Sequence, residues 1–145
     1  MTKFYTYLIL SSACVFASCD KENDPEPESR ASLISSTSEF GKTWSISSIE
    51  TTFGSTSPFQ CVMDNFITYY PSKSYETREG KDKCAPTDPA SQTGTWFLNT
   101  SETELTVSLP DSTQTWAIEG VNRTTLQLSS SFPEGNRTYV LVSQD

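Results

Sequence analysis

Residues 94–120 read GTWFLNTSETELTVSLPDSTQTWAIEG, and this stretch decides the fold class. Its apolar side chains recur at every second position, as in the series Leu105, Val107 and Leu109. A period of two places alternate side chains on opposite faces of a β-strand. With the turn residues Pro110-Asp111-Ser112 near its centre, the stretch predicts neighbouring strands of an antiparallel meander.

The same alternation recurs on both sides of this stretch. Trp44 and Ile46 are separated by one polar residue, and so are Leu126 and Leu128. These segments are rich in Thr, Ser, Tyr and Trp, a composition that favours a pleated surface. The predicted strands cover residues 43–52, 65–70, 73–79, 93–99, 103–109, 113–120, 123–130 and 137–143. Eight short antiparallel strands predict an all-β domain, which is either a small closed barrel or a sandwich.

Helical patterns are confined to two short segments. Residues 58–64 and a stretch near residues 36–42 are the only places in the globular part where a helix is expected.

The amino terminus has the pattern of a secretory signal peptide. Lys3 is the only charged residue before Cys19, and residues 4–17 carry no charge. This apolar run is shorter than the roughly 20 residues that a membrane-spanning helix needs. Residues 16–19 read Phe-Ala-Ser-Cys, which resembles the lipobox of bacterial lipoproteins. The resemblance implies that residues 1–18 are removed and that Cys19 carries the lipid that holds the chain on a membrane.

Residues 19–38 are expected to form a lipidated, disordered and acidic tether, because they are rich in Asp, Glu, Pro and Ser. The folded domain is then expected to fill residues 39–145. The cluster Asp20-Lys21-Glu22-Asn23-Asp24 resembles the signal that sends lipoproteins of the Bacteroidetes to the outer face of the outer membrane. The resemblance implies a lipid anchor in the outer membrane at the cell surface, with the periplasmic leaflet as the alternative location.

The charge of the chain excludes several classes of partner and reaction. Eighteen Asp and Glu residues outnumber 10 Lys and Arg, and no basic cluster interleaved with aromatic residues is present. Nucleic-acid binding needs such a cluster to neutralise phosphates. The sequence also contains no histidine, which removes the commonest general base near neutral pH. We therefore expect no nucleic-acid partner, no cofactor and no enzymatic activity.

Carboxylate pairs are the remaining candidates for acid–base chemistry. Glu102 with Glu104, and Glu79 with Asp82, are close enough in sequence to act together. Both pairs lie in polar stretches that resemble turns, so we interpret them as solvated surface. Asp64 lies between a cysteine and a predicted strand, where a capping or turn hydrogen bond is the preferred interpretation.

Two cysteines belong to the predicted domain. An even pair in an exported chain favours a disulfide between Cys61 and Cys84, which would close a loop of 24 residues. The alternative is a zinc site, which would need carboxylates to complete its four ligands because histidine is absent. We prefer the disulfide and expect no metal.

Several motifs occur in an order that points to a known family. Gly41-Lys42-Thr43-Trp44-Ser45-Ile46 is followed by Cys61-Val62-Met63-Asp64-Asn65-Phe66-Ile67-Thr68-Tyr69, by Cys84 and by Gly94-Thr95-Trp96-Phe97-Leu98. This order resembles the lipocalin-like lipoproteins of the Bacteroidetes over about residues 40–143. The resemblance implies an eight-stranded antiparallel up-and-down meander that closes into a β-barrel. Most members of that family have no established ligand, so it implies no activity.

Aromatic residues are numerous for so small a domain. The candidates for either core packing or the lining of a ligand cavity are Trp44, Phe66, Trp96, Trp116 and Tyr139. An eight-stranded barrel has an interior just wide enough for side chains or for one small ligand. Two functions follow from these alternatives. The barrel binds a small apolar or glycan-derived molecule, or it is filled and docks to an envelope partner through its outer surface.

A further candidate modification site lies in a predicted turn. Asp111-Ser112-Thr113 resembles the motif at which Bacteroidetes O-glycosylate exported proteins, with Ser112 as the acceptor. Neither this motif nor any other pattern in the sequence specifies an oligomeric state.

Overall fold

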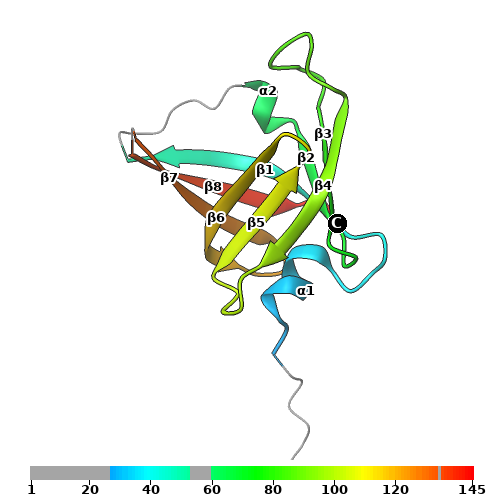
Figure 1. Cartoon of the computed structure of the whole chain (residues 1–145), viewed down its shortest axis with the longest axis vertical. Coiled ribbons are helices and arrows are strands. Elements are labelled where there is room, and N and C mark those ends of the chain that lie inside the picture. Colours follow the sequence, from blue (N-terminus) through cyan, green and yellow to red (C-terminus); the bar gives the residue numbers. More distant parts are fainter. Residues whose placement is uncertain (1–26, 53–59, 134) are drawn as a thin grey trace, which may run out of the picture.

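Eight antiparallel strands follow one another around a closed barrel, in which β8 returns to pair with β1 (Figure 1). The computed structural model describes residues 27–52, 60–133 and 135–145. The strands are β1 (Lys42–Thr51), β2 (Phe66–Tyr69), β3 (Ser74–Arg78), β4 (Ser91–Leu98), β5 (Glu104–Leu109), β6 (Ser112–Val121), β7 (Thr125–Phe132) and β8 (Gly135–Ser143). The predicted all-β fold class is confirmed. Of the two predicted alternatives, the structure is the closed barrel and not the sandwich.

The strand register places the apolar positions of each strand inside the barrel. Trp44 on β1 lies opposite Ile67 on β2, and Leu105 on β5 lies opposite Trp116 on β6. Opposite residues in an antiparallel pair point to the same face, so the apolar sets of neighbouring strands meet. Gly94 on β4 is required by close approach, because a Cβ there would clash with the backbone oxygen of Ser108.

One end of the barrel is filled with close-packed side chains. The largest fully buried side chains there come from five strands and are Trp44, Trp96, Leu105, Leu126 and Leu141. Helix α1 (Arg30–Ser35) covers this end (Figure 1). Its Ile34 is completely buried and belongs to the same apolar cluster. We call this the plugged end.

Helix α1 is held on the barrel by hydrogen bonds as well as by burial. The Ser29 side chain caps its amino terminus by accepting from the Ser32 backbone N–H. The Arg30 backbone N–H and guanidinium donate to Glu102 in the β4–β5 loop, each at 2.9 Å. Trp44 Nε1 donates to the Ile34 carbonyl oxygen at 2.9 Å. Glu102, one residue of the candidate pair Glu102 and Glu104, therefore binds the helix.

Two expectations about this region differ from the structure. The disordered tether was predicted for residues 19–38, yet residues 30–35 form a helix, so the folded part begins earlier than residue 39. No helix forms over residues 36–42, because Ser36 and Gly41 have φ values of 64° and 73°. Such left-handed backbone ends a helix, and β1 begins directly at Lys42.

The opposite end of the barrel carries helix α2 (Gln60–Met63), which confirms the helical pattern predicted at residues 58–64 for the part that is described. The predicted disulfide between Cys61 and Cys84 is also confirmed, with the two Cα atoms 5.0 Å apart. It joins α2 to the loop between β3 and β4 at this end of the barrel (Figure 1). We call this the open end.

Candidate ligand cavity

A half-open cavity of about 190 Å³ lies inside the barrel, beyond the side chains that fill the plugged end. Its lining residues come from β1, β2, β3, β6, β7 and β8, and they are Ile46, Ile67, Tyr69, Tyr75, Gln114, Trp116, Leu128, Tyr139 and Leu141. The cavity is therefore enclosed by strands from most of the barrel. Pockets of this kind, which are mostly apolar with a few polar groups, bind small molecules.

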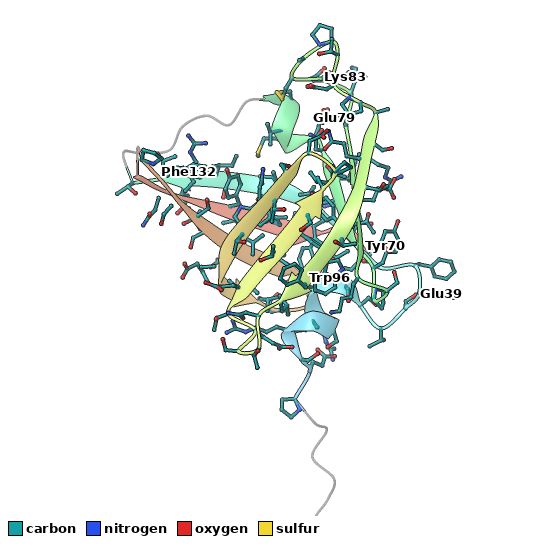
Figure 2. The ribbon with its side chains drawn as sticks, in the orientation of Figure 1. Glu39, Tyr70, Glu79, Lys83, Trp96 and Phe132 are labelled. Carbon is teal, nitrogen blue, oxygen red and sulfur yellow. A yellow bond between two sulfur atoms is a disulfide. The ribbon has the colours of Figure 1, made fainter. Side chains whose placement is uncertain are left out.

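The floor of the cavity is a cluster of aromatic rings. Tyr69 is 2% exposed, and its ring centroid lies 5.4 Å from that of Tyr75 and 5.6 Å from that of Trp96. Tilted and edge-to-face contacts at these distances are favourable beyond the area they bury. Trp96 lies in the half of the barrel next to α1 (Figure 2), and its Nε1 donates to the Tyr70 carbonyl oxygen at 2.9 Å. These contacts fix the floor in place.

The floor tyrosines remain protonated at neutral pH. Burial, together with the neighbouring Tyr75, raises the pKa of Tyr69 well above its ordinary value. Burial raises the pKa of Tyr75 to about 12, although a hydrogen bond with Thr77 opposes the shift. Both side chains therefore present neutral hydroxyl groups.

None of the described residues that line the cavity is charged. Gln114 is the only amide among them, and it is exposed at the rim. Arg137 on β8 is not part of this lining, and its guanidinium carbon lies 4.5 Å from the centre of the Phe132 ring. Phe132 lies at the far tip of the β7–β8 hairpin (Figure 2). A charged ligand group in the cavity would lack a partner there, which is costly in an apolar site.

The five aromatic candidates separate into three groups. Trp116 and Tyr139 line the cavity, whereas Trp44 and Trp96 are buried at the plugged end. Phe66 is 38% exposed, so the proposal that it belongs to the core or the cavity is wrong. Ile67, the next residue on β2, faces inward instead and lies opposite Trp44.

Sequence reasoning missed most of the lining. Ile46, Leu128 and Leu141 were available from the period-two pattern, and Tyr75 follows from its position opposite Tyr69 on the inner face. Gln114 could not be found in this way, because a polar residue at an inward position breaks the pattern.

Hydrogen bonds of Asp64 and Asn65 join the start of the β2–β3 hairpin to the chain that follows β3, close to the disulfide. Asp64 Oδ2 accepts from the Asp82 backbone N–H at 2.9 Å. Asn65 accepts from the Gly80 backbone N–H at 2.8 Å and donates to Glu79 Oε1 at 3.1 Å. The Asp64 carboxylate thus accepts from a backbone N–H 18 positions away, in the loop after β3, so the capping or turn hydrogen bond expected from the sequence is not the one that it makes. Within the described ranges, no group of three or more Asp, Glu or Cys residues is arranged to hold a metal ion.

Described residues also line hollows on the outside of the barrel. One, of about 310 Å³, is lined by polar and charged residues that include Lys42 and Arg123, but both are already engaged: Lys42 Nζ donates to two carbonyl oxygens and Arg123 pairs with Glu28. Another, of about 410 Å³, lies beside the Pro110 turn and includes the exposed Ser112. Glycosylation of Ser112 stays a prediction.

Closed eight-stranded up-and-down barrels of this kind, which include the lipocalin fold, have interiors that accommodate side chains or one small ligand. No protein-family model matches the sequence, and no curated protein is significantly similar to it. The structure is similar to the crystal structure of a lipocalin-like protein from Bacteroides uniformis, with 11% sequence identity and a TM-score of 0.49. The similarity covers 69% of this chain and 94% of that chain. Within the described part of the chain, neither helix has the length and apolar character needed to cross a bilayer.

Proposed function

We propose that this protein is a lipid-anchored, non-enzymatic binding protein of the outer membrane, and that its barrel holds one small apolar molecule. The observation that supports binding is the cavity of about 190 Å³ at the open end. An engineered apolar cavity of about 150 Å³ in another protein is large enough for benzene. The lining favours an apolar molecule over a glycan fragment, because a sugar would bring several hydroxyl groups and the cavity offers few polar partners.

The proposed anchor precedes helix α1, which covers the plugged end of the barrel. Eleven peptide bonds separate Cys19 from Arg30, the first residue of α1. A chain of this length spans at most about 40 Å. A lipid on Cys19 would therefore hold α1 and the plugged end within about 40 Å of the membrane. We place the anchor at the cell surface, with the periplasmic leaflet as the alternative.

Toluene titration of the folded protein tests the binding function. We expect saturable one-to-one binding, observed as chemical-shift changes of the Trp116 and Tyr139 resonances. Replacing Ile67 with Trp should fill the cavity and weaken binding at least about tenfold, because toluene can no longer bury its surface. The matched control is Phe66→Trp, which adds the same side chain to the outer face of the same strand and should leave binding unchanged.

A second blocking variant keeps the test decisive if Ile67→Trp fails to fold. Gln114 is exposed at the rim, so Gln114→Trp obstructs the entrance without overpacking the core. Absence of binding to the native protein would contradict the binding function and would leave the filled barrel that docks to an envelope partner as the alternative.

Replacement of Cys19 tests the anchor. In the native host, Cys19→Ser should move the protein from the membrane fraction to the soluble fraction and abolish incorporation of a labelled fatty acid, because two or more acyl chains supply stable attachment. Cys14→Ser is the matched control, since Cys14 lies within the predicted signal peptide and should have no effect. Continued membrane attachment of the Cys19 variant would refute the anchor.

Protease treatment of intact cells then distinguishes the cell surface from the periplasmic leaflet, where the protein would survive the treatment.

A further inference from the structure

The floor of the cavity contains a tyrosine hydroxyl group that is not hydrogen-bonded. Tyr69 lines the cavity, and its side chain is 2% exposed. None of the described residues forms a hydrogen bond with its hydroxyl. The buried polar side-chain atoms without a partner in the described part of the chain are Asp64 Oδ1 and Glu79 Oε2, so the Tyr69 hydroxyl oxygen keeps access to the cavity. The Tyr69 hydroxyl is therefore available to a molecule in the cavity.

The neighbouring polar groups are less suited to this role. The Tyr75 side chain is less deeply buried, at 8% exposed, and Tyr139 is only half-buried. The Gln114 amide lies at the exposed rim, where water competes for its hydrogen bonds. Tyr69 is thus the most deeply buried tyrosine of the described lining.

The remaining walls favour a flat, uncharged molecule. Trp116, Tyr139 and Tyr75 contribute aromatic rings, and Leu128 and Leu141 contribute aliphatic surface. Aromatic side chains bind other rings through stacked and edge-to-face contacts. Because the described lining residues are all uncharged, a carboxylate or an ammonium group inside the cavity would be buried without a counter-charge.

We infer that the ligand is an uncharged molecule with a single flat ring and one hydrogen-bonding group, and that this group pairs with the Tyr69 hydroxyl at the floor of the cavity. The inference rests on the proposed binding function and narrows it to a ligand class. A carboxylate buried within the cavity falls outside this class, since none of the described lining residues carries a charge.

Phenol and toluene form a matched pair of probes, because they have nearly the same size and differ in a hydroxyl in place of a methyl group. For the native protein, we expect both probes to bind and benzoate to bind at least about a hundredfold more weakly than phenol. In Tyr69→Phe, toluene affinity should change by less than about twofold, whereas phenol affinity should fall about tenfold, which is the loss expected for one hydrogen bond. Isothermal titration calorimetry measures all three.

The matched control variant is Tyr70→Phe. The Tyr70 hydroxyl donates to Glu76 Oε2 at 3.0 Å on the outside of the barrel (Figure 2). The same substitution there should leave the ratio of phenol to toluene affinity unchanged. If Tyr69 acted only through the fold, Tyr69→Phe would change the affinities for phenol and toluene by the same factor. A change in the ratio of the two affinities therefore reports the hydrogen bond.

The outcomes separate this inference from the proposed function. If toluene binds and Tyr69→Phe leaves the phenol-to-toluene ratio unchanged, the hydrogen bond is refuted and the binding function stands. If benzoate binds more tightly than phenol, the uncharged ligand class is wrong. If none of the three probes binds the native protein, the proposed function fails as well.

Discussion

Replacing Trp44 with alanine is expected to lower the free energy of unfolding by about 4 kcal/mol, the scale on which a buried large-to-small substitution acts. The Trp44 side chain is completely buried in the plugged end of the barrel. Its Nε1 donates to the Ile34 carbonyl oxygen, and the Lys42 ammonium lies 4.6 Å from the centre of its ring. The substitution therefore leaves a cavity and also removes the contact that holds α1 on the barrel. Urea denaturation followed by circular dichroism measures the loss.

Trp116→Ala is the matched control for this prediction. Trp116 is half-buried and lines the cavity, so one side of its ring has no close-packed neighbours in the protein. Its replacement should lower the free energy of unfolding by about 2 kcal/mol, which is clearly less than the loss for Trp44. An equal or larger loss for Trp116 would mean that the interior is packed at the open end, contrary to the structure. Trp44→Phe should fall between the two, since it keeps a ring but leaves the Ile34 carbonyl oxygen unpaired.

Removing the disulfide is expected to cost roughly 3 kcal/mol on the chain-entropy model, because the bond closes a loop between residues that are 23 positions apart. The double variant Cys61→Ala with Cys84→Ala should unfold at lower urea concentration than the native protein. Either single variant should lose about as much as the double variant, because each already breaks the bond. The measurement is urea denaturation without reductant.

Hydrogen exchange locates the effect of the disulfide. Reduction should accelerate exchange most strongly in α2 and in the loop between β3 and β4, since the bond joins them. The backbone N–H groups of Gly80 and Asp82 should retain some protection, because their hydrogen bonds to Asn65 and Asp64 do not depend on it. A loss of stability below about 1 kcal/mol would show that these hydrogen bonds, rather than the disulfide, hold the segment.

The strands were predictable because their burial is one-sided. An inward and an outward face produce the period-two pattern directly, and Leu105 and Val107 on β5 show it clearly. Every predicted strand overlaps an observed strand, and the bounds differ by no more than two residues. Helix α1 has no comparable signal. Its sequence is RASLIS, and its stability derives from the burial of Ile34 and from the Glu102 hydrogen bonds, which are tertiary contacts.

The candidate site was only partly predictable for a related reason. Phe66 and Ile67 are consecutive apolar residues, so alternation alone does not decide which one faces inward. The register with β1 decides it in favour of Ile67. Whether inward side chains fill the barrel depends on the summed volumes of residues from all eight strands, such as Trp96 at the plugged end and Leu128 at the cavity. No local pattern encodes that sum.

A crystal structure of the protein grown with toluene would show whether the barrel binds a ligand in its interior. We expect one toluene molecule inside the barrel, in contact with Trp116, Tyr69 and Leu128, with the backbone of the barrel unchanged. Crystals of Ile67→Trp should contain no toluene at this position. A native structure in which Trp116 and Tyr139 close the interior, and toluene is absent or bound only to the outer surface, would refute ligand binding inside the barrel.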